Sequence, residues 1–219
     1  MTTVTGEIRE ILPTWAIAVL IPLPAATFWQ DGSGRAFAYA YLFLGCAIMT
    51  AERFRRPLPG NADLAAGGAA SAWRAKMTAL GLAMAGAVAV LTTFAWSMSG
   101  QPEAVVPLLA TLAALPALCC VPVLTISIGK PYAAVLFTTF LLGAVKIAGC
   151  VVVRIVYGPE ALAEGRMDLP FERPNLLVWL CFAGAGILSA VMFPLGMRAF
   201  NRCQALAADA NVTVTISGS

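Results

Sequence analysis

Long apolar stretches alternate with short polar clusters along the whole chain. Six of these stretches approach the roughly 20 residues that a helix needs to cross a ~30 Å hydrocarbon core. We expect membrane-spanning helices at residues 11–29, 36–54, 77–99, 104–128, 131–154 and 175–198. The pattern therefore predicts an all-α integral membrane protein with about six transmembrane helices, in a single transmembrane domain that covers residues 1–219.

The composition supports this assignment. The chain is 60% hydrophobic and 11% charged, whereas a soluble domain carries roughly 25% charged residues. Histidine, the commonest metal ligand and the usual axial ligand of haem, is absent. The predicted spans also lack paired carboxylates that could act as general acid and base. We therefore expect neither a cofactor nor a metal site, and we do not expect an enzyme.

The distribution of Lys and Arg predicts the orientation of the chain in the membrane. Cytoplasmic loops retain positive charge, and with six spans nine of these residues fall on one side and four on the other. Both termini are therefore expected in the cytoplasm of a bacterial-type inner membrane. The same topology predicts a cytoplasmic loop at 55–76, an outer loop at 157–174 and a C-terminal tail at 203–219.

The two loops have different characters. In the cytoplasmic loop, Asn61 is a candidate N-cap for a short interfacial helix over 62–76, which Gly67 and Gly68 would weaken. In the outer loop, acidic residues recur at four-residue spacing, so that one helical turn would present a single acidic face. These residues are Glu160, Glu164 and Asp168.

Lys146 is the one ionisable residue well inside a predicted span. A charged lysine near the bilayer centre costs ~2.5–3.5 kcal/mol on insertion scales, so such a residue usually faces protein or water. Two interpretations remain open. Lys146 either contacts an anionic substrate or a lipid headgroup along a transport path, or it extends to the outer surface as Arg154 is expected to do.

Prolines and small residues predict how the spans bend and pack. The fourth span is the candidate for a bent helix because prolines interrupt helical hydrogen bonding, and it carries Pro107, Pro116 and Pro122. Small residues let membrane helices approach closely, either within the chain or against a second subunit. They are dense at Gly81, Ala85, Gly86 and Ala89, and again at Gly184, Ala185, Gly186, Ser189 and Ala190.

Four short segments of the chain occur in a characteristic order. They are Gly6-Glu7-Ile8-Arg9-Glu10-Ile11-Leu12-Pro13 before the first span, Thr50-Ala51-Glu52-Arg53 closing the second, Trp73-Arg74-Ala75-Lys76 opening the third, and Arg198-Ala199-Phe200-Asn201-Arg202 closing the sixth. In this layout the chain resembles the permease subunits of type-2 ABC exporters, the ABC-2 transporter family. The stretch 127–134 is similar to that family's turn between the fourth and fifth spans. The chain departs from the family in its Ala- and Gly-rich sequence before Lys76.

The resemblance implies roles for particular residues. A short amphipathic N-terminal "elbow" helix would include Glu7, Arg9 and Glu10. A region that couples to an ATPase would include Asn61, Asp63, Trp73, Arg74 and Lys76. Spans two and five would line the transport route, with Lys146 near it. The implied partners are a nucleotide-binding ATPase subunit, a similar permease in a homo- or heterodimer, and lipids, with no nucleic acid.

The expected function is therefore that of a transmembrane permease subunit in an ATP-driven export system, with ATP hydrolysis on the partner. A path so apolar favours a lipid-like or amphipathic substrate. The alternative is a structural or assembly subunit of a larger membrane complex, which the scarcity of polar groups in the spans favours. An ion-coupled carrier would normally place Asp or Glu inside its spans, and the uncharged runs within the six predicted spans, 36–51 in the second, contain none.

Overall fold

The computed structural model describes residues 4–26, 32–55, 61–100, 105–158 and 176–217. Every element in these residues is a helix, which confirms the all-α prediction. The helices are α1 (Val4–Leu20), α2 (Pro22–Ala26), α3 (Gly32–Arg55), α4 (Asn61–Ser99), α5 (Val105–Ile128), α6 (Pro131–Tyr157) and α8 (Leu176–Ser217).

Four segments of these helices are long and apolar enough to cross a membrane. They are Ala70–Ser99, Val105–Ile128, Pro131–Val156 and Val178–Cys203. They correspond to the third, fourth, fifth and sixth predicted spans, so the chain has the character of a multi-pass membrane protein. The first predicted span falls on α1 and α2, and the second falls on α3.

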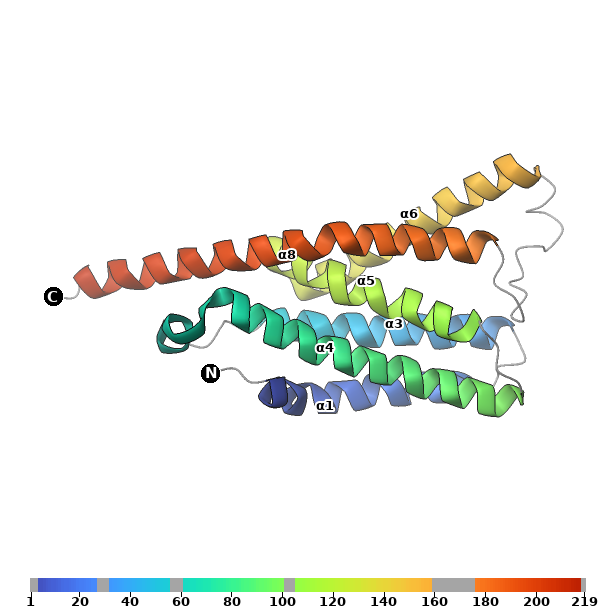
Figure 1. Ribbon diagram of the computed structural model, residues 1–219, viewed down its shortest axis with the longest axis horizontal. Coiled ribbons are helices and arrows are strands. Elements are labelled where there is room, and N and C mark those ends of the chain that lie inside the picture. The colour runs from blue at the N-terminus through green and yellow to red at the C-terminus, as the bar shows by residue number, and fades with distance from the viewer. Residues whose placement is uncertain (1–3, 27–31, 56–60, 101–104, 159–175, 218–219) are drawn as a thin grey trace.

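The helices form an elongated bundle in which α2 continues α1 and each later helix runs opposite to the one before it (Figure 1). The starts of α1 and α4 and the end of α8 lie at one end, which we call the terminal end, and α4 reaches the distal end at Ser99. Helix α5 packs against α3, α4, α6 and α8. Its apolar segment is 61% buried, against 17% for α6 and 22% for α8, so α5 is the central helix.

Helix α4 differs from the prediction of a loop that contains a separate short helix. It is one continuous helix from Asn61 to Ser99, although its first turns lie at an angle to the rest in Figure 1. A glycine costs only about 1 kcal/mol in a helix, and alanine is the best helix former. The alanine-rich sequence around Gly67 and Gly68 therefore keeps the helix intact.

Near both ends of the chain, the bounds of the helices also differ from those of the predicted elements. The predicted elbow residues are the first turns of α1, and the predicted tail continues α8 to Ser217. The first span is divided after Leu20, because a residue that precedes proline disfavours helical geometry and Pro22 follows Ile21. The outer loop, with its acidic residues, lies outside the described residues beyond Gly158.

Helix α1 is held closely between α3 and α4. A Cβ atom on Gly45 of α3 would lie 2.6 Å from the Ala18 Cβ and 2.8 Å from the Ala18 Cα. On the other side, the indole Nε1 of Trp15 donates to the Ala83 carbonyl at 2.6 Å, and Gly86 leaves room for its ring. Small residues thus serve packing within the chain here.

We expect Gly45→Val to destabilise the bundle, because its side chain would overlap the Ala18 backbone. Overpacking of this kind typically costs about 1–3 kcal/mol. Thermal unfolding in mild detergent, followed by circular dichroism, measures the effect. Gly143→Val is the matched control, since Gly143 is also helical but has nothing within 4 Å of its Cβ position. Equal unfolding midpoints for the two variants would contradict this account of the α1–α3 contact.

Candidate functional site

A set of charged side chains from three helices meets at the terminal end of the bundle. Arg53 of α3 donates from Nη2 to Glu7 Oε2 and from Nη1 to Glu10 Oε2, the latter at 2.5 Å. Lys76 of α4 lies with Nζ 3.3 Å from Glu7 Oε1, and it also donates to the Arg53 carbonyl at 3.4 Å. We call Glu7, Glu10, Arg53 and Lys76 the ionic network.

The ionic network is buried but balanced in charge. Glu7 is 2% exposed, Arg53 8% and Lys76 6%, whereas Glu10 reaches the surface. Buried charges are tolerated only when they are paired and hydrogen-bonded. Two carboxylates face two cations here, and Glu7 also lies in the first turn of α1, where the helix dipole favours a negative charge.

The sequence places the network residues through simple helical geometry. Glu7 and Glu10 are three residues apart on α1 and therefore share one face. Arg53 lies in the last turn of α3, so its guanidinium can bridge both carboxylates with its two terminal nitrogens. Glu7 consequently points into the bundle, while Ile8 and Leu12 are exposed. This polarity suits a helix whose surroundings are apolar.

An aromatic cluster lies beside the ionic network and brings in α8. It comprises Phe54 of α3, Trp73 of α4, and Phe193 and Phe200 of α8. Ring centroids are 5.3 Å apart for Phe54 and Trp73, 5.4 Å for Trp73 and Phe200, and 6.1 Å for Trp73 and Phe193. Gly196 permits this approach, because a Cβ there would lie 2.8 Å from the Trp73 ring. Since Phe54 follows Arg53 in the chain, the cluster and the network share α3 and α4.

The structure brings some of the predicted site residues together and separates others. Glu7, Glu10 and Lys76 meet in the ionic network, and Trp73 is 1% exposed inside the aromatic cluster. Arg9 and Arg74 are exposed outside the network. Asn61 and Asp63 lie in the first turn of α4, and their side chains fall outside the described part of the structure.

Arg53 is the central residue that the prediction of site residues missed. The sequence offers Arg53, Arg55 and Arg56 close together at the end of the second span. Nothing in that run indicates which guanidinium turns inward. The only available signal is that the two acidic residues of α1 need a cationic partner once their face is buried.

A second candidate site lies on the bundle surface where α3, α5, α6 and α8 meet. It is an apolar pocket of about 500 Å3, within the ~300–1,000 Å3 range of ligand pockets. Among its lining residues, Lys146 is the only charged one, and Tyr39, Phe43, Leu142 and Val178 are among the others. Lys146 is exposed, so its ammonium lies at the edge of an apolar cavity. Such a pocket suits an amphiphile with an anionic end.

The described residues contain no group of three or more His, Cys, Asp or Glu side chains that could hold a metal ion. Comparison of the chain with protein-family models, curated proteins and solved structures finds no match. The function is therefore inferred from the ionic network, the aromatic cluster and the Lys146 pocket.

We expect Arg53→Met to destabilise the protein strongly, because it leaves Glu7 buried with less compensating charge. Breaking a buried ion pair from one side costs about 3–5 kcal/mol. Thermal or denaturant unfolding in detergent measures the loss. Arg74→Met is the control, since Arg74 is exposed on α4 and surface substitutions usually stay within about 0.5 kcal/mol.

A double variant tests the pairing itself. Arg53→Met combined with Glu7→Gln removes both opposed charges and should recover part of the stability that Arg53→Met loses. Strictly additive losses would show that the two side chains are not coupled.

Proposed function

We propose that this chain is a transmembrane permease subunit of an ATP-driven export system. It pairs with a second permease, alike or related, and with separate nucleotide-binding subunits that hydrolyse ATP. The observation that carries the proposal is the connection between α4 and the bundle. The ionic network and the aromatic cluster attach α4 to α1, α3 and α8 at one end of the molecule.

The proposed topology has six spans, with α1 and α2 together as the first and α3 as the second. Both termini then lie in the cytoplasm of a bacterial inner membrane. The excess of Lys and Arg in the connections at the terminal end supports this orientation. Figure 1 is compatible with it, because the start of α1 and the end of α8 lie at the same end of the bundle.

The length of α4 supports a coupling role for its first turns. The apolar segment of α4, Ala70–Ser99, has 30 residues and is about 45 Å long at 1.5 Å per residue, longer than the ~30 Å hydrocarbon core. Its start therefore extends beyond the core, where a cytoplasmic ATPase can dock. Because α4 is continuous, a displacement of Asn61 and Asp63 is transmitted directly into the span.

The residues where α4 enters the bundle divide into two roles under this proposal. Trp73 and Lys76 are buried, so they transmit movement to the other helices and do not touch the ATPase. Arg74 is exposed between them in the sequence, so it is available for direct contact together with Asn61 and Asp63. The elbow residues Glu7 and Glu10 receive the movement through the ionic network.

The substrate path runs past the Lys146 pocket in this proposal. Helices α3 and α6 are the second and fifth predicted spans, and both line that pocket. Its single ammonium and apolar walls favour an anionic amphiphile over an inorganic ion.

A structural or assembly subunit is the second candidate. The low burial of α6 and α8, 17% and 22% of their apolar segments, favours it, because partner helices could cover these faces in a larger complex. The two candidates differ in what they bind.

Affinity purification of the tagged full-length protein in mild detergent, with mass spectrometry of its partners, separates the two candidates. We expect an ATPase with the intact chain. The paired variant Asp63→Lys, Arg74→Glu should recover about tenfold less of it, which corresponds to ~1.4 kcal/mol of lost binding free energy. Arg198→Glu, an exposed charge change on α8, should recover the normal amount. Recovery of an unrelated membrane assembly without an ATPase would instead establish the structural role.

We expect Lys146→Met to weaken binding of a fluorescent fatty acid about tenfold or more, because a hydrogen bond to a charged group contributes about 1.5–3 kcal/mol. Fluorescence titration in lipid nanodiscs measures the affinity. Arg154→Met is the matched control, since it removes an exposed cation from the same helix outside the pocket lining. Equal affinities of wild type and Lys146→Met would exclude the lysine from the site.

A further inference from the structure

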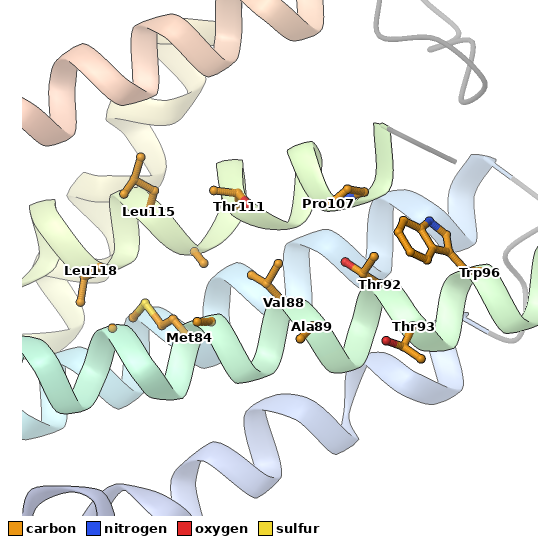
Figure 2. A pocket seen from close by; sticks show the side chains of 13 residues that line it. Met84, Val88, Ala89, Thr92, Thr93, Trp96, Pro107, Thr111, Leu115 and Leu118 are labelled. Atoms are coloured by element: carbon orange, nitrogen blue, oxygen red, sulfur yellow. The ribbon is translucent and has the colours of Figure 1, made fainter. Parts of the chain in front are cut away.

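A second pocket lies between α4 and α5, and we call it the α4–α5 groove. Its volume is about 540 Å3. Figure 2 shows side chains of α4 at four-residue spacing facing α5 across the groove, namely Met84, Val88, Thr92 and Trp96. The residues of α5 that line the groove include Pro107, Thr111, Leu115 and Leu118. Gly81, Ala85 and Ala89 also line it, and their small side chains leave the space open.

The polarity of the α4–α5 groove changes along its length. Near the distal end it is lined by threonines and by a tryptophan, a residue typical of membrane interfaces: Thr92, Thr93, Thr111 and Trp96. Further in, it is lined by Met84, Leu115 and Leu118. None of its lining residues is charged. This gradient matches a lipid whose acyl chain points inward and whose ester region lies toward the distal surface.

The length of the groove also fits a lipid. Gly81 and Trp96 are separated by about 22 Å along α4 at 1.5 Å per residue. One leaflet contributes about 15 Å to a ~30 Å hydrocarbon core. The α4–α5 groove therefore covers the depth of one leaflet and continues into its interface.

The hydroxyl of Thr92 has no hydrogen-bond partner, although the residue is only 7% exposed. Threonines in membrane helices commonly donate to the carbonyl one turn earlier. Thr138 does so to Ala134 at 2.9 Å, and Thr50 does so to Cys46 at 2.8 Å. A buried hydroxyl without a partner is unfavourable, and among the described residues Thr92 is the one groove-lining residue that has such a hydroxyl.

The depth of Thr92 favours a particular acceptor. It lies about 10 Å inside the distal end of α4 at Ser99, at 1.5 Å per residue. A headgroup phosphate stays at the membrane surface, whereas the ester carbonyls of a phospholipid lie deeper, next to the acyl chains. The depth of this hydroxyl therefore matches that of an ester carbonyl.

We propose that the α4–α5 groove binds an ester-linked phospholipid from the leaflet at the distal end. The acyl chain lies against Met84, Leu115 and Leu118, and an ester carbonyl accepts a hydrogen bond from Thr92. This site is separate from the Lys146 pocket, to which α5 contributes Leu109, Leu112 and Ala113. It therefore does not depend on the chain being a permease.

Native mass spectrometry of the purified full chain tests the site. The protein is mixed with equal amounts of ester-linked and ether-linked phosphatidylcholine of the same chain length. We expect about a threefold preference for the ester lipid, the ratio that follows from an average hydrogen bond in a membrane protein. The isosteric variant Thr92→Val should lose this preference and retain both lipids equally.

Filling the groove supplies an independent measurement. Gly81→Leu should abolish retention of the lipid, because Gly81 lines the groove. Gly186→Leu is the matched control and should leave lipid retention unchanged, because Gly186 does not line the groove. Both glycines have nothing within 4 Å of their Cβ positions. Ala89→Leu on the exposed rim replaces Gly81→Leu if circular dichroism shows that the latter is unfolded.

Three results would overturn the proposal. The first is equal retention of ester and ether lipids by the wild type. The second is a preference that survives in Thr92→Val. The third is a dimer of this chain that Gly81→Leu dissociates while lipid retention stays unchanged, which would assign the groove to a helix of a second copy.

Discussion

The pairing of Arg53 with Glu7 is the interaction on which the rest of the bundle depends. Glu7 is buried at the start of α1, where its carboxylate pairs with both Arg53 and Lys76. Separating α1 from α3 and α4 would leave opposed charges uncompensated in apolar surroundings, which is strongly unfavourable. The network thus fixes the rotation of α1. The contacts further along that helix, Ala18 against Gly45 and Trp15 against Ala83, follow from this rotation.

The aromatic cluster extends that constraint to α8. Trp73 lies one turn before Lys76 on α4, so the ring contacts and the ion pair are made by the same short stretch of helix. Four helices are consequently joined where α4 enters the bundle, while α6 and much of α8 remain open to lipid or partners. A force applied to the start of α4 acts on this junction before it acts on any other part of the molecule.

Hydropathy alone predicted the all-helical fold, since a helix satisfies its backbone hydrogen bonds within the membrane, and four of its six predicted spans are segments long and apolar enough to cross a membrane. It did not predict the continuity of α4, because a Gly67-Gly68 pair is also compatible with a loop. It also could not locate the ionic network. Charged residues at span ends, such as Arg53 and Lys76, ordinarily extend toward water, and only the rotation of packed helices determines which turn inward. The pocket beside Lys146 likewise requires four helices in place.

Helix α5 lines both the Lys146 pocket and the α4–α5 groove. It stays helical through Pro116 and Pro122, but each proline lacks the N–H that would bond the carbonyl four residues earlier. Those carbonyls belong to Leu112, which lines the Lys146 pocket, and to Leu118, which lines the α4–α5 groove. The backbone of α5 is thus least restrained beside both cavities. Helix α5 therefore supplies a wall to each cavity at a point where one of its own carbonyls lacks its usual helical donor.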